Sequence, residues 1–160
     1  MFMKKLTIFI IICFIFSTSI FAQTRKNEKP FVIPELKHWE GNSGVFQITS
    51  KTKIIFPKDN QEFAEIAHLF SCDFEKMFGI KIKTSDGKSS EGDIVFNINK
   101  NTNLKYEEYE ICINDKIEIK ANSRRAAIWS TRTILQIAEQ NERSLPKGFI
   151  RDNPDYEMRS

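Results

Sequence analysis

The sequence is poor in the residues that most chemical sites require. Its 160 residues include only two histidines, three cysteines and six glycines. No group of His and Cys has the spacing of a zinc site. No glycine-rich segment has the pattern of a phosphate-binding loop, and no hydrolase triad is evident. These absences argue against a metal enzyme, a nucleotide-binding protein and a serine hydrolase, and we expect neither a metal nor an organic cofactor.

A surplus of charge is also lacking. The chain has 24 Lys and Arg against 21 Asp and Glu, which gives a formal net charge of +3. Two of the positive charges, Lys4 and Lys5, lie in the first 22 residues, so the rest of the chain has a net charge of only +1. A protein without a basic surplus is not expected to attract nucleic acid.

A long hydrophobic run occurs at the N-terminus. Lys4 and Lys5 precede an almost unbroken apolar run over residues 6–16, and Ala22 provides a small residue before Gln23. This pattern predicts a secretory signal peptide over residues 1–22. The run is short for a transmembrane helix, so no stable membrane span is expected after cleavage, although an uncleaved anchor remains an alternative. We expect a periplasmic, cell-surface or extracellular protein.

The three cysteines do not indicate a lipid anchor or a chemical site. Cys13 lies in the leader behind the bulky Ile12, which is unfavourable for lipid attachment. The exported chain retains Cys72 and Cys112, which we expect to be buried thiols. A disulfide between them is the alternative, because the sequence does not show whether their Cβ atoms meet.

The first half of the folded part contains strands and one well-marked helix. Residues 23–30 are polar and are expected to form a disordered linker. Residues 45–48, 53–56 and 80–84 are rich in β-branched and aromatic residues, which is typical of strands. Asp59 or Asn60 can cap a helix that ends at Gly79. Its apolar stripe, which we expect to face a core, consists of Phe63, Ile66, Ala67, Phe70, Phe74, Met77 and Phe78.

The second half contains a hairpin and a second helix. After a strand at 93–98, alternating runs at 108–113 and 116–121 flank Asn114-Asp115, which predicts a hairpin. A helix starts after Asn122 or Ser123 and is followed by a loop at 145–148. Its inner stripe consists of Ala127, Thr131, Ile134, Leu135 and Ala138. This order predicts an α+β fold, with a mixed or mainly antiparallel sheet and two helices on one face.

We expect ordinary structural roles for several polar residues that could be taken for sites. Arg124 and Arg125 begin the second helix, where cations oppose the helix dipole, and a solvated pair is expected. Glu107, Glu108 and Glu110 are interpreted as charges on a strand surface rather than as a catalytic acid and base.

The C-terminal segment has a specific pattern. Asp152, Pro154, Tyr156 and Arg159 match the string Asp-x-Pro-x-Tyr/Phe-x-x-Arg-Gly, with Ser160 in place of Gly. This string resembles the entry into the catalytic barrel of family 20 glycoside hydrolases, the exo-β-N-acetylhexosaminidases.

The second helix adds to this resemblance. Thr133 and Gln136 match the string Gly-x-x-Thr-Leu-x-Gln-Leu of the accessory domain of the same family, with Ser130 in place of Gly. The resemblance covers roughly residues 31–160.

The resemblance implies a division of the chain and a function. Residues 31–148 would be the N-terminal accessory domain, and residues 149–160 the start of a catalytic barrel whose remainder is missing. The parent enzyme would remove terminal N-acetylglucosamine or N-acetylgalactosamine from glycans by substrate-assisted retention. Its catalytic Glu and Asp would come from the barrel, so the chain itself would contain no catalytic residue and would be inactive. Arg159 would bind hydroxyl groups of the terminal sugar once the barrel is present.

Two alternatives remain open at this point. The chain could be a stand-alone glycan-binding or surface-interaction module, for which Trp39, Tyr106 and Tyr109 are candidate platform residues. It could also be the accessory domain of a different glycosidase.

Overall fold

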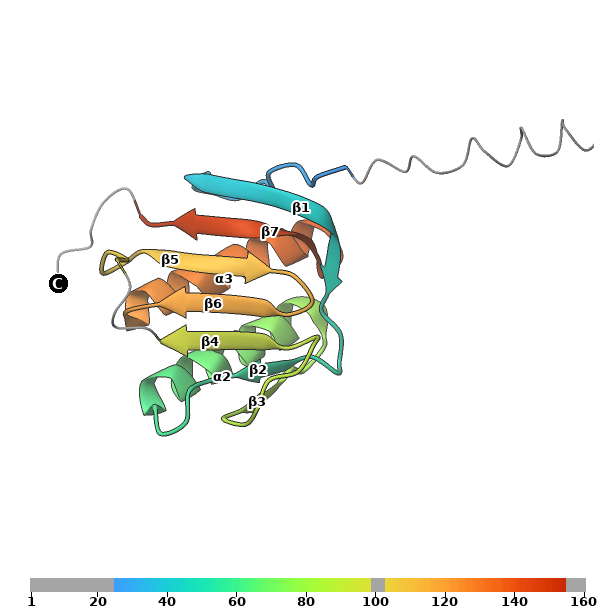
Figure 1. The fold of residues 1–160 in the computed structure, drawn as a ribbon. Coiled ribbons are helices and arrows are strands. Elements are labelled where there is room, and N and C mark those ends of the chain that lie inside the picture. Colours follow the sequence, from blue (N-terminus) through green and yellow to red (C-terminus); the bar gives the residue numbers. More distant parts are fainter. Residues whose placement is uncertain (1–24, 99–102, 155–160) are drawn as a thin grey trace, which may run out of the picture.

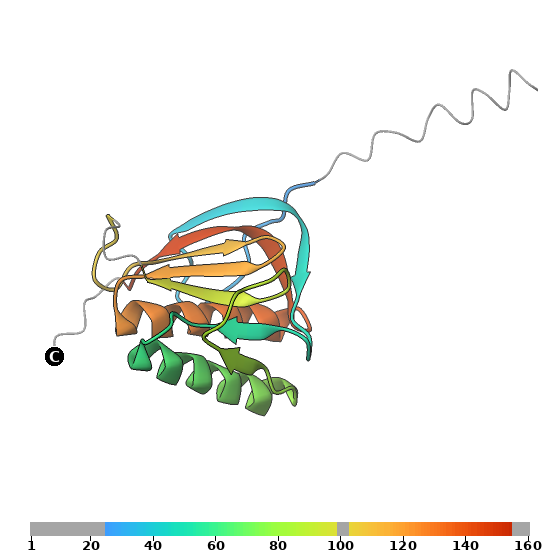
Figure 2. The ribbon, with the colours of Figure 1, turned by 60° about the horizontal axis from the view of Figure 1, so that its bottom comes forward.

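The computed structural model describes residues 25–98 and 103–154, which form one mixed sheet covered on one face by two helices (Figures 1 and 2). The seven strands lie in the order β1-β7-β5-β6-β4-β2-β3. Their bounds are β1 His38–Gln47, β2 Lys53–Ile55, β3 Lys83–Ser85, β4 Ile94–Ile98, β5 Tyr109–Ile113, β6 Ile117–Ala121 and β7 Ser144–Asp152. The helices are α2 Gln61–Phe78 and α3 Arg124–Gln140. The predicted α+β class and the single helical face are therefore confirmed.

Capping residues mark the start of both helices and the end of α2. The Asn60 side chain accepts a hydrogen bond from the Phe63 N–H at the start of α2, and Gly79 ends the helix with φ of 68°. The Ser123 hydroxyl accepts from the Ala126 N–H in the same way at the start of α3. One member of the predicted stripe of α2 is misplaced, because Met77 is 42% exposed.

The two helices run parallel because each connects two parallel strands. Strand β2 leads through α2 to the parallel β3, and β6 leads through α3 to β7. Since β5 is antiparallel to both β6 and β7, these two strands run in the same direction. Strands β2, β4 and β6 are parallel neighbours, so α2 and α3 also share one direction.

The core lies between the sheet and the helices. Alternate residues of β5, β6 and β7 are buried against α3, whereas Cys112 and Glu110 point to the opposite face and are only half-buried. The largest fully buried side chains are Phe70, Phe74, Phe96, Leu36, Ile48, Ile54, Ile66, Ile82, Ile94, Ile111, Ile113 and Ile117. The hydrophobic effect of burying this set is the main source of stability of the domain.

Strand β7 corrects the predicted end of the domain. The sequence analysis placed a loop at 145–148 and the start of a barrel at 149, but Ser144–Asp152 is a continuous strand between β1 and β5. Pro146 is tolerated because it pairs with Val45 of β1 in a part of β7 that β5 does not reach. A proline lacks an N–H donor and fits where one edge of a strand is unpaired.

The polar N-terminal segment also differs from expectation. Asn27, predicted to lie in a disordered linker over residues 23–30, donates through its side chain to the carbonyls of Gly44 and Lys147. Its carbonyl accepts from Trp39 Nε1 at 3.3 Å. A Cβ atom at Gly41 would lie 2.0 Å from that carbonyl oxygen, so the backbone of the segment approaches β1 too closely for any other residue.

The cysteines of the described residues do not pair. Cys72 lies on α2 and Cys112 on the other face of the sheet, and both are free and half-buried rather than fully buried. Over residues 25–98 and 103–154, no helix is both long and apolar enough to cross a membrane. The same residues contain no group of three or more His, Cys, Asp or Glu that could hold a metal ion.

Candidate functional site

Four of the described residues that carry the family resemblance lie around one pocket. Thr133 and Gln136 of α3 and Asp152 and Pro154 at the end of β7 line a cavity of about 200 Å³. We call it the exit pocket, because the described chain ends at Pro154 on its wall. Its other lining residues are Val32, Ile33, Pro34, Tyr109, Trp129, Arg132 and Asn153. The matched residues are far apart in sequence, so only the fold brings them together.

Asp152 is held in place by a buried hydrogen-bond network. The Tyr109 hydroxyl donates to Asp152 Oδ2 at 2.9 Å and lies 2.7 Å from Thr133 Oγ1. Asp152 Oδ1 accepts from the backbone N–H of Lys37 at 3.3 Å. Burial raises the pKa of Tyr109 far above its ordinary value, and the negative charge of Asp152 acts in the same direction. Tyr109 therefore remains a protonated donor that ties the end of β7 to β5 and α3.

Gln136 holds the segment that precedes β1. Its Oε1 accepts from the Ile33 N–H at 2.9 Å, and its Nε2 donates to the Ile33 carbonyl at 3.1 Å. Gln140, one helical turn later, donates to the Phe31 carbonyl at 2.8 Å. Two amide side chains on one face of α3 thus fix the wall of the exit pocket formed by residues 31–34.

Trp129 is a site residue that the sequence analysis missed. It lies at helical spacing from Arg132, Thr133 and Gln136, so the four side chains form one stripe beside the inner stripe of α3. Its Nε1 is buried and has no hydrogen-bond partner among the described residues. Tracing the helical spacing back from Thr133 would have found it. The pocket wall therefore combines an aromatic ring, an unused donor and two prolines.

The acidic residues near the N-terminus of α3 are paired with cations. Glu107 and Glu108 are only 5% and 8% exposed, so the expectation of surface charges was wrong for both. Glu107 accepts from Arg125 at 3.0 Å, and Glu108 accepts from Arg151 at 2.7 Å. The hydrogen bond from Arg151 holds the pKa of Glu108 below its ordinary value. An ionised carboxylate paired in this way is suited to holding structure rather than to donating a proton.

Of the solvated pair expected at the start of α3, Arg124 is exposed as predicted, whereas Arg125 is partly buried. Arg124 forms a salt bridge of 3.2 Å with Glu65 of α2, and Arg125 forms the bridge to Glu107. Farther along the helices, Arg132 binds Asp73 at 2.6 Å. The two bridges between α2 and α3 have the same sequence offset, because the helices are parallel.

The aromatic residues proposed as a glycan platform do not share a surface. Tyr109 is 2% exposed. Trp39 is half-buried against β7, where a Cβ atom at Gly148 would lie 2.4 Å from its ring. Tyr106, by contrast, is 63% exposed. A sugar platform needs aromatic faces that are open and adjacent, and these three residues do not provide it.

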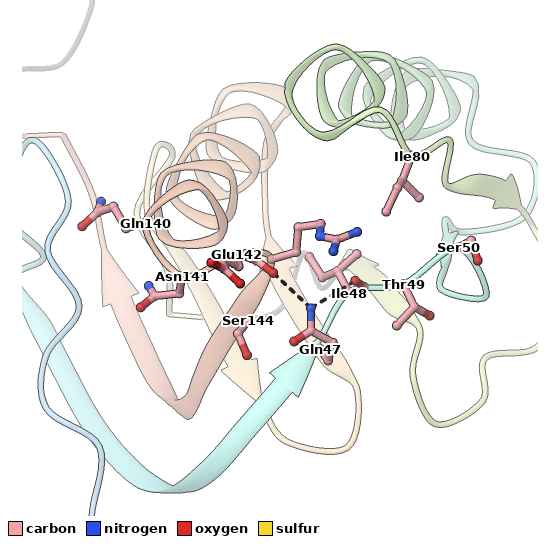
Figure 3. Close-up of a pocket in the computed structure, with 10 residues that line it drawn as sticks. Gln47, Ile48, Thr49, Ser50, Ile80, Gln140, Asn141, Glu142 and Ser144 are labelled. Carbon is pink, nitrogen blue, oxygen red and sulfur yellow. Dashed lines mark hydrogen bonds between the residues drawn. The ribbon is translucent and has the colours of Figure 1, made fainter.

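A second pocket lies at the other end of α3 (Figure 3). It has a volume of about 840 Å³ and is open, with walls formed by residues 47–50, residues 140–144 and Ile80. Gln47 Nε2 donates to the carbonyl of Glu142 at 3.2 Å across it (Figure 3). Glu142 and Arg143 form a tight turn with positive φ angles of 50° and 69°. None of the described residues that carry the family resemblance lines this pocket, so the exit pocket is the candidate site.

Comparisons with known proteins agree with the fold and the motifs. A model of glycosyl hydrolase family 20, domain 2, matches residues 29–153. A lacto-N-biosidase from Bifidobacterium bifidum is 22% identical over 134 residues, which are 82% of this chain and 12% of that protein.

Solved structures show the same fold. The chitobiase of Flavobacterium johnsoniae matches with a TM-score of 0.58 and 22% identity over 78% of this chain and 21% of that one. The N-acetyl-β-hexosaminidase of Streptomyces plicatus matches with a TM-score of 0.65 and 17% identity over 86% of this chain and 29% of that one. The chain therefore spans less than a third of each of these relatives.

The predicted substrate ligand Arg159 lies outside the described residues, as does Tyr156. The structure places their motif partners Asp152 and Pro154 at the exit pocket.

Proposed function

Because the chain belongs to glycosyl hydrolase family 20, with domain 2 of that family over residues 29–153, we propose that it is the non-catalytic N-terminal domain of a secreted β-N-acetylhexosaminidase. The observation that carries the proposal is the meeting of Thr133, Gln136 and Asp152 at the end of β7. Thr133 and Asp152, which come from two separate family strings, are both bound to the Tyr109 hydroxyl where the chain leaves the sheet, and Gln136 holds the wall of the same pocket formed by residues 31–34. A domain that fixes this point can orient a following barrel.

The catalytic groups belong to that barrel in our proposal. A Glu would protonate the leaving oxygen, and an Asp would orient the acetamido group of the substrate, which attacks the anomeric carbon. Glu107 forms a salt bridge with Arg125, and Glu108 forms one with Arg151. Neither carboxylate lines the exit pocket, which supports a non-catalytic role for this domain. Arg159 would bind two hydroxyls of the terminal amino sugar, because a guanidinium offers a fixed fork of donors.

An activity assay tests the proposal directly. The chain is compared with a polypeptide extended through the barrel, with a chromogenic N-acetylglucosaminide as substrate. We expect turnover by the extended polypeptide alone. Turnover by the 160-residue chain that is lost on replacing one of its own acidic residues would overturn the proposal. Export is tested separately, since a chain processed behind residues 1–22 begins at Gln23 and is identified by its mass.

A second candidate is an accessory domain of a glycosidase with a different specificity. The observation that favours it is the match to a protein named lacto-N-biosidase. Assaying the extended polypeptide with a chromogenic lacto-N-bioside beside the N-acetylglucosaminide distinguishes the two, since the preferred substrate is the one with the larger kcat/KM.

A further inference from the structure

We propose that the second pocket, at the end of α3, binds a short neutral oligosaccharide. We call it the turn groove, because the turn of Glu142 and Arg143 forms part of its wall. The inference goes beyond the proposed function, because it concerns a site on this domain that is separate from the exit pocket. It holds whatever reaction the parent protein catalyses.

The turn groove has the size of a ligand site. Its volume of about 840 Å³ lies within the usual range of about 300–1,000 Å³, whereas the exit pocket has only about 200 Å³. Segments that are distant in sequence form its walls, with Asn141 and Ser144 on one side in Figure 3 and Ser50 and Ile80 on the other. Because the groove is open, the ends of an oligosaccharide can extend beyond it.

The walls contain hydrogen-bond acceptors that the domain does not use. Gln47 and Gln140 direct their amide nitrogens to backbone carbonyls, which leaves both Oε1 atoms without a partner among the described residues. Asn141 donates to the Ile137 carbonyl in the same way, and its Oδ1 is unused. The carboxylate of Glu142 also has no partner in the described part of the chain. Four acceptor side chains are therefore available to a ligand.

Donors lie beside these acceptors. The half-buried Arg143 lines the groove, and its guanidinium forms no hydrogen bond or salt bridge with another described residue. The hydroxyl groups of Ser50 and Ser144 are likewise without a partner within residues 25–98 and 103–154. A sugar hydroxyl donates one hydrogen bond and can accept two, so it suits a wall that mixes donors and acceptors.

The charge of the walls favours a neutral ligand. Glu142 and Arg143 are the charged residues among those that line the groove, and their formal charges cancel. An anion would face the unused acceptors and the C-terminal ends of α2 and α3, which carry partial negative charge. A cation would lie near the unpaired Arg143 guanidinium.

The backbone of the turn supports a binding role for its side chains. Glu142 and Arg143 have φ angles of 50° and 69°, a region that favours glycine. The turn is fixed by the Ile48 N–H, which donates to the Arg143 carbonyl at 3.0 Å, and by Gln47, which donates to the Glu142 carbonyl. Strained residues that the surrounding structure holds in place occur preferentially at functional sites. Glycine would fit this backbone but would offer the groove no polar group.

A titration followed by NMR tests the proposal in the 160-residue chain, so that the proposed active site of the barrel does not contribute. The neutral probes are three trisaccharides, triacetylchitotriose, cellotriose and maltotriose. We expect the backbone amide signals of residues 48–50 and 141–144 to shift with at least one of them. The cationic glucosamine trimer and the anionic trigalacturonate are the charged controls. Both should bind at least about tenfold more weakly than the best neutral probe.

Variants of Arg143 separate binding from folding. Arg143→Gly fits the turn but lacks the guanidinium, so it should raise Kd for the neutral probe at least about tenfold while the chain stays folded. Arg143→Ala keeps the Cβ atom and should weaken binding equally. Arg124→Ala is the matched control, because Arg124 lies at the other end of α3 and does not line the groove.

Three results would overturn the proposal. The first is that none of the neutral trisaccharides shifts the signals of the turn groove. The second is that a charged trimer binds more tightly than every neutral probe. The third is that both Arg143 variants, with spectra of folded proteins, bind the neutral probe like the parent.

Discussion

Tyr109 of β5 and Asp152 of β7 face each other across adjacent strands, and the phenol donates a hydrogen bond of 2.9 Å to the carboxylate. The relationship gives a structural role to the first residue of the C-terminal family string. Asp152 is the last residue of β7, so the bond holds the chain at the point where it leaves the sheet. Both residues line the exit pocket, so this hydrogen bond also fixes part of the pocket wall.

Replacing Tyr109 with Phe should destabilise the chain. The change removes the hydroxyl but keeps the ring, which leaves Asp152 Oδ2 and the Thr133 hydroxyl without this partner in a buried place. We expect a loss of about 1–3 kcal/mol in the free energy of unfolding, measured with urea. Tyr106→Phe is the control and should change stability by less than about 0.5 kcal/mol. Equal stability of both variants would mean that the network contributes nothing.

Replacing Leu135 with Ala tests the assignment of the core. Leu135 is 4% exposed on the inner side of α3. Truncation should cost about 2–5 kcal/mol, because it removes buried methyl groups and leaves a cavity. A thermal melt measures the effect, with Glu139→Ala on the exposed side of the same helix as control. A melting temperature like that of the parent would reject the core assignment.

Replacing Arg143 with Gly should stabilise the chain. Arg143 has a φ angle of 69° in the turn after α3, a conformation that costs a residue with a Cβ atom about 1–3 kcal/mol. Glycine relieves this cost but loses some chain entropy, so we expect a net gain of about 1 kcal/mol in urea unfolding. Arg143→Ala retains the Cβ atom and should show no such gain. If Gly and Ala variants have equal stability, the turn is not strained.

Acid unfolding should depend on the pairing of Glu108 with Arg151. The hydrogen bond from Arg151 lowers the pKa of Glu108 in the folded chain. A lowered pKa stabilises the folded state fully above the unfolded value of about 4.3, and this contribution is lost as pH falls through the folded value. Glu108→Gln should therefore show a shallower loss of stability than the parent below about pH 4.3. Parallel curves from urea titrations at several pH values would contradict this.

Arg159 should matter for activity where the domain arginines do not. In the extended polypeptide we expect Arg159→Ala to lower kcat/KM at least about a hundredfold, since two charge-assisted hydrogen bonds are lost. Arg159→Lys should recover little, because a point charge does not reproduce the fork. Arg124→Ala and Arg125→Ala should change kcat/KM by less than about threefold, because both arginines are engaged in salt bridges within the domain. Near-parental activity of all three alanine variants would reject the role of Arg159.

Local signals in the sequence predicted most of the elements. The caps at Asn60 and Ser123 and the glycine at Gly79 place three helix ends, because capping depends on a few neighbouring residues. The hairpin at Asn114-Asp115 is equally local. Strand β7 was missed because Pro146 and Gly148 signal a loop, and only the neighbours β1 and β5 make that segment a strand.

The amino-acid sequence by itself determined the helices, the hairpin, the α+β class and the family strings, all of which rest on short-range spacing. The tertiary structure decided what required distant residues to meet. It buried Glu107 and Glu108 against Arg125 and Arg151, and it fastened Asn27 to β1 and β7. It also joined Thr133, Tyr109 and Asp152 beside the exit pocket. Strand order and helix packing determine these contacts. The spacing of residues along the chain does not determine which strands become neighbours.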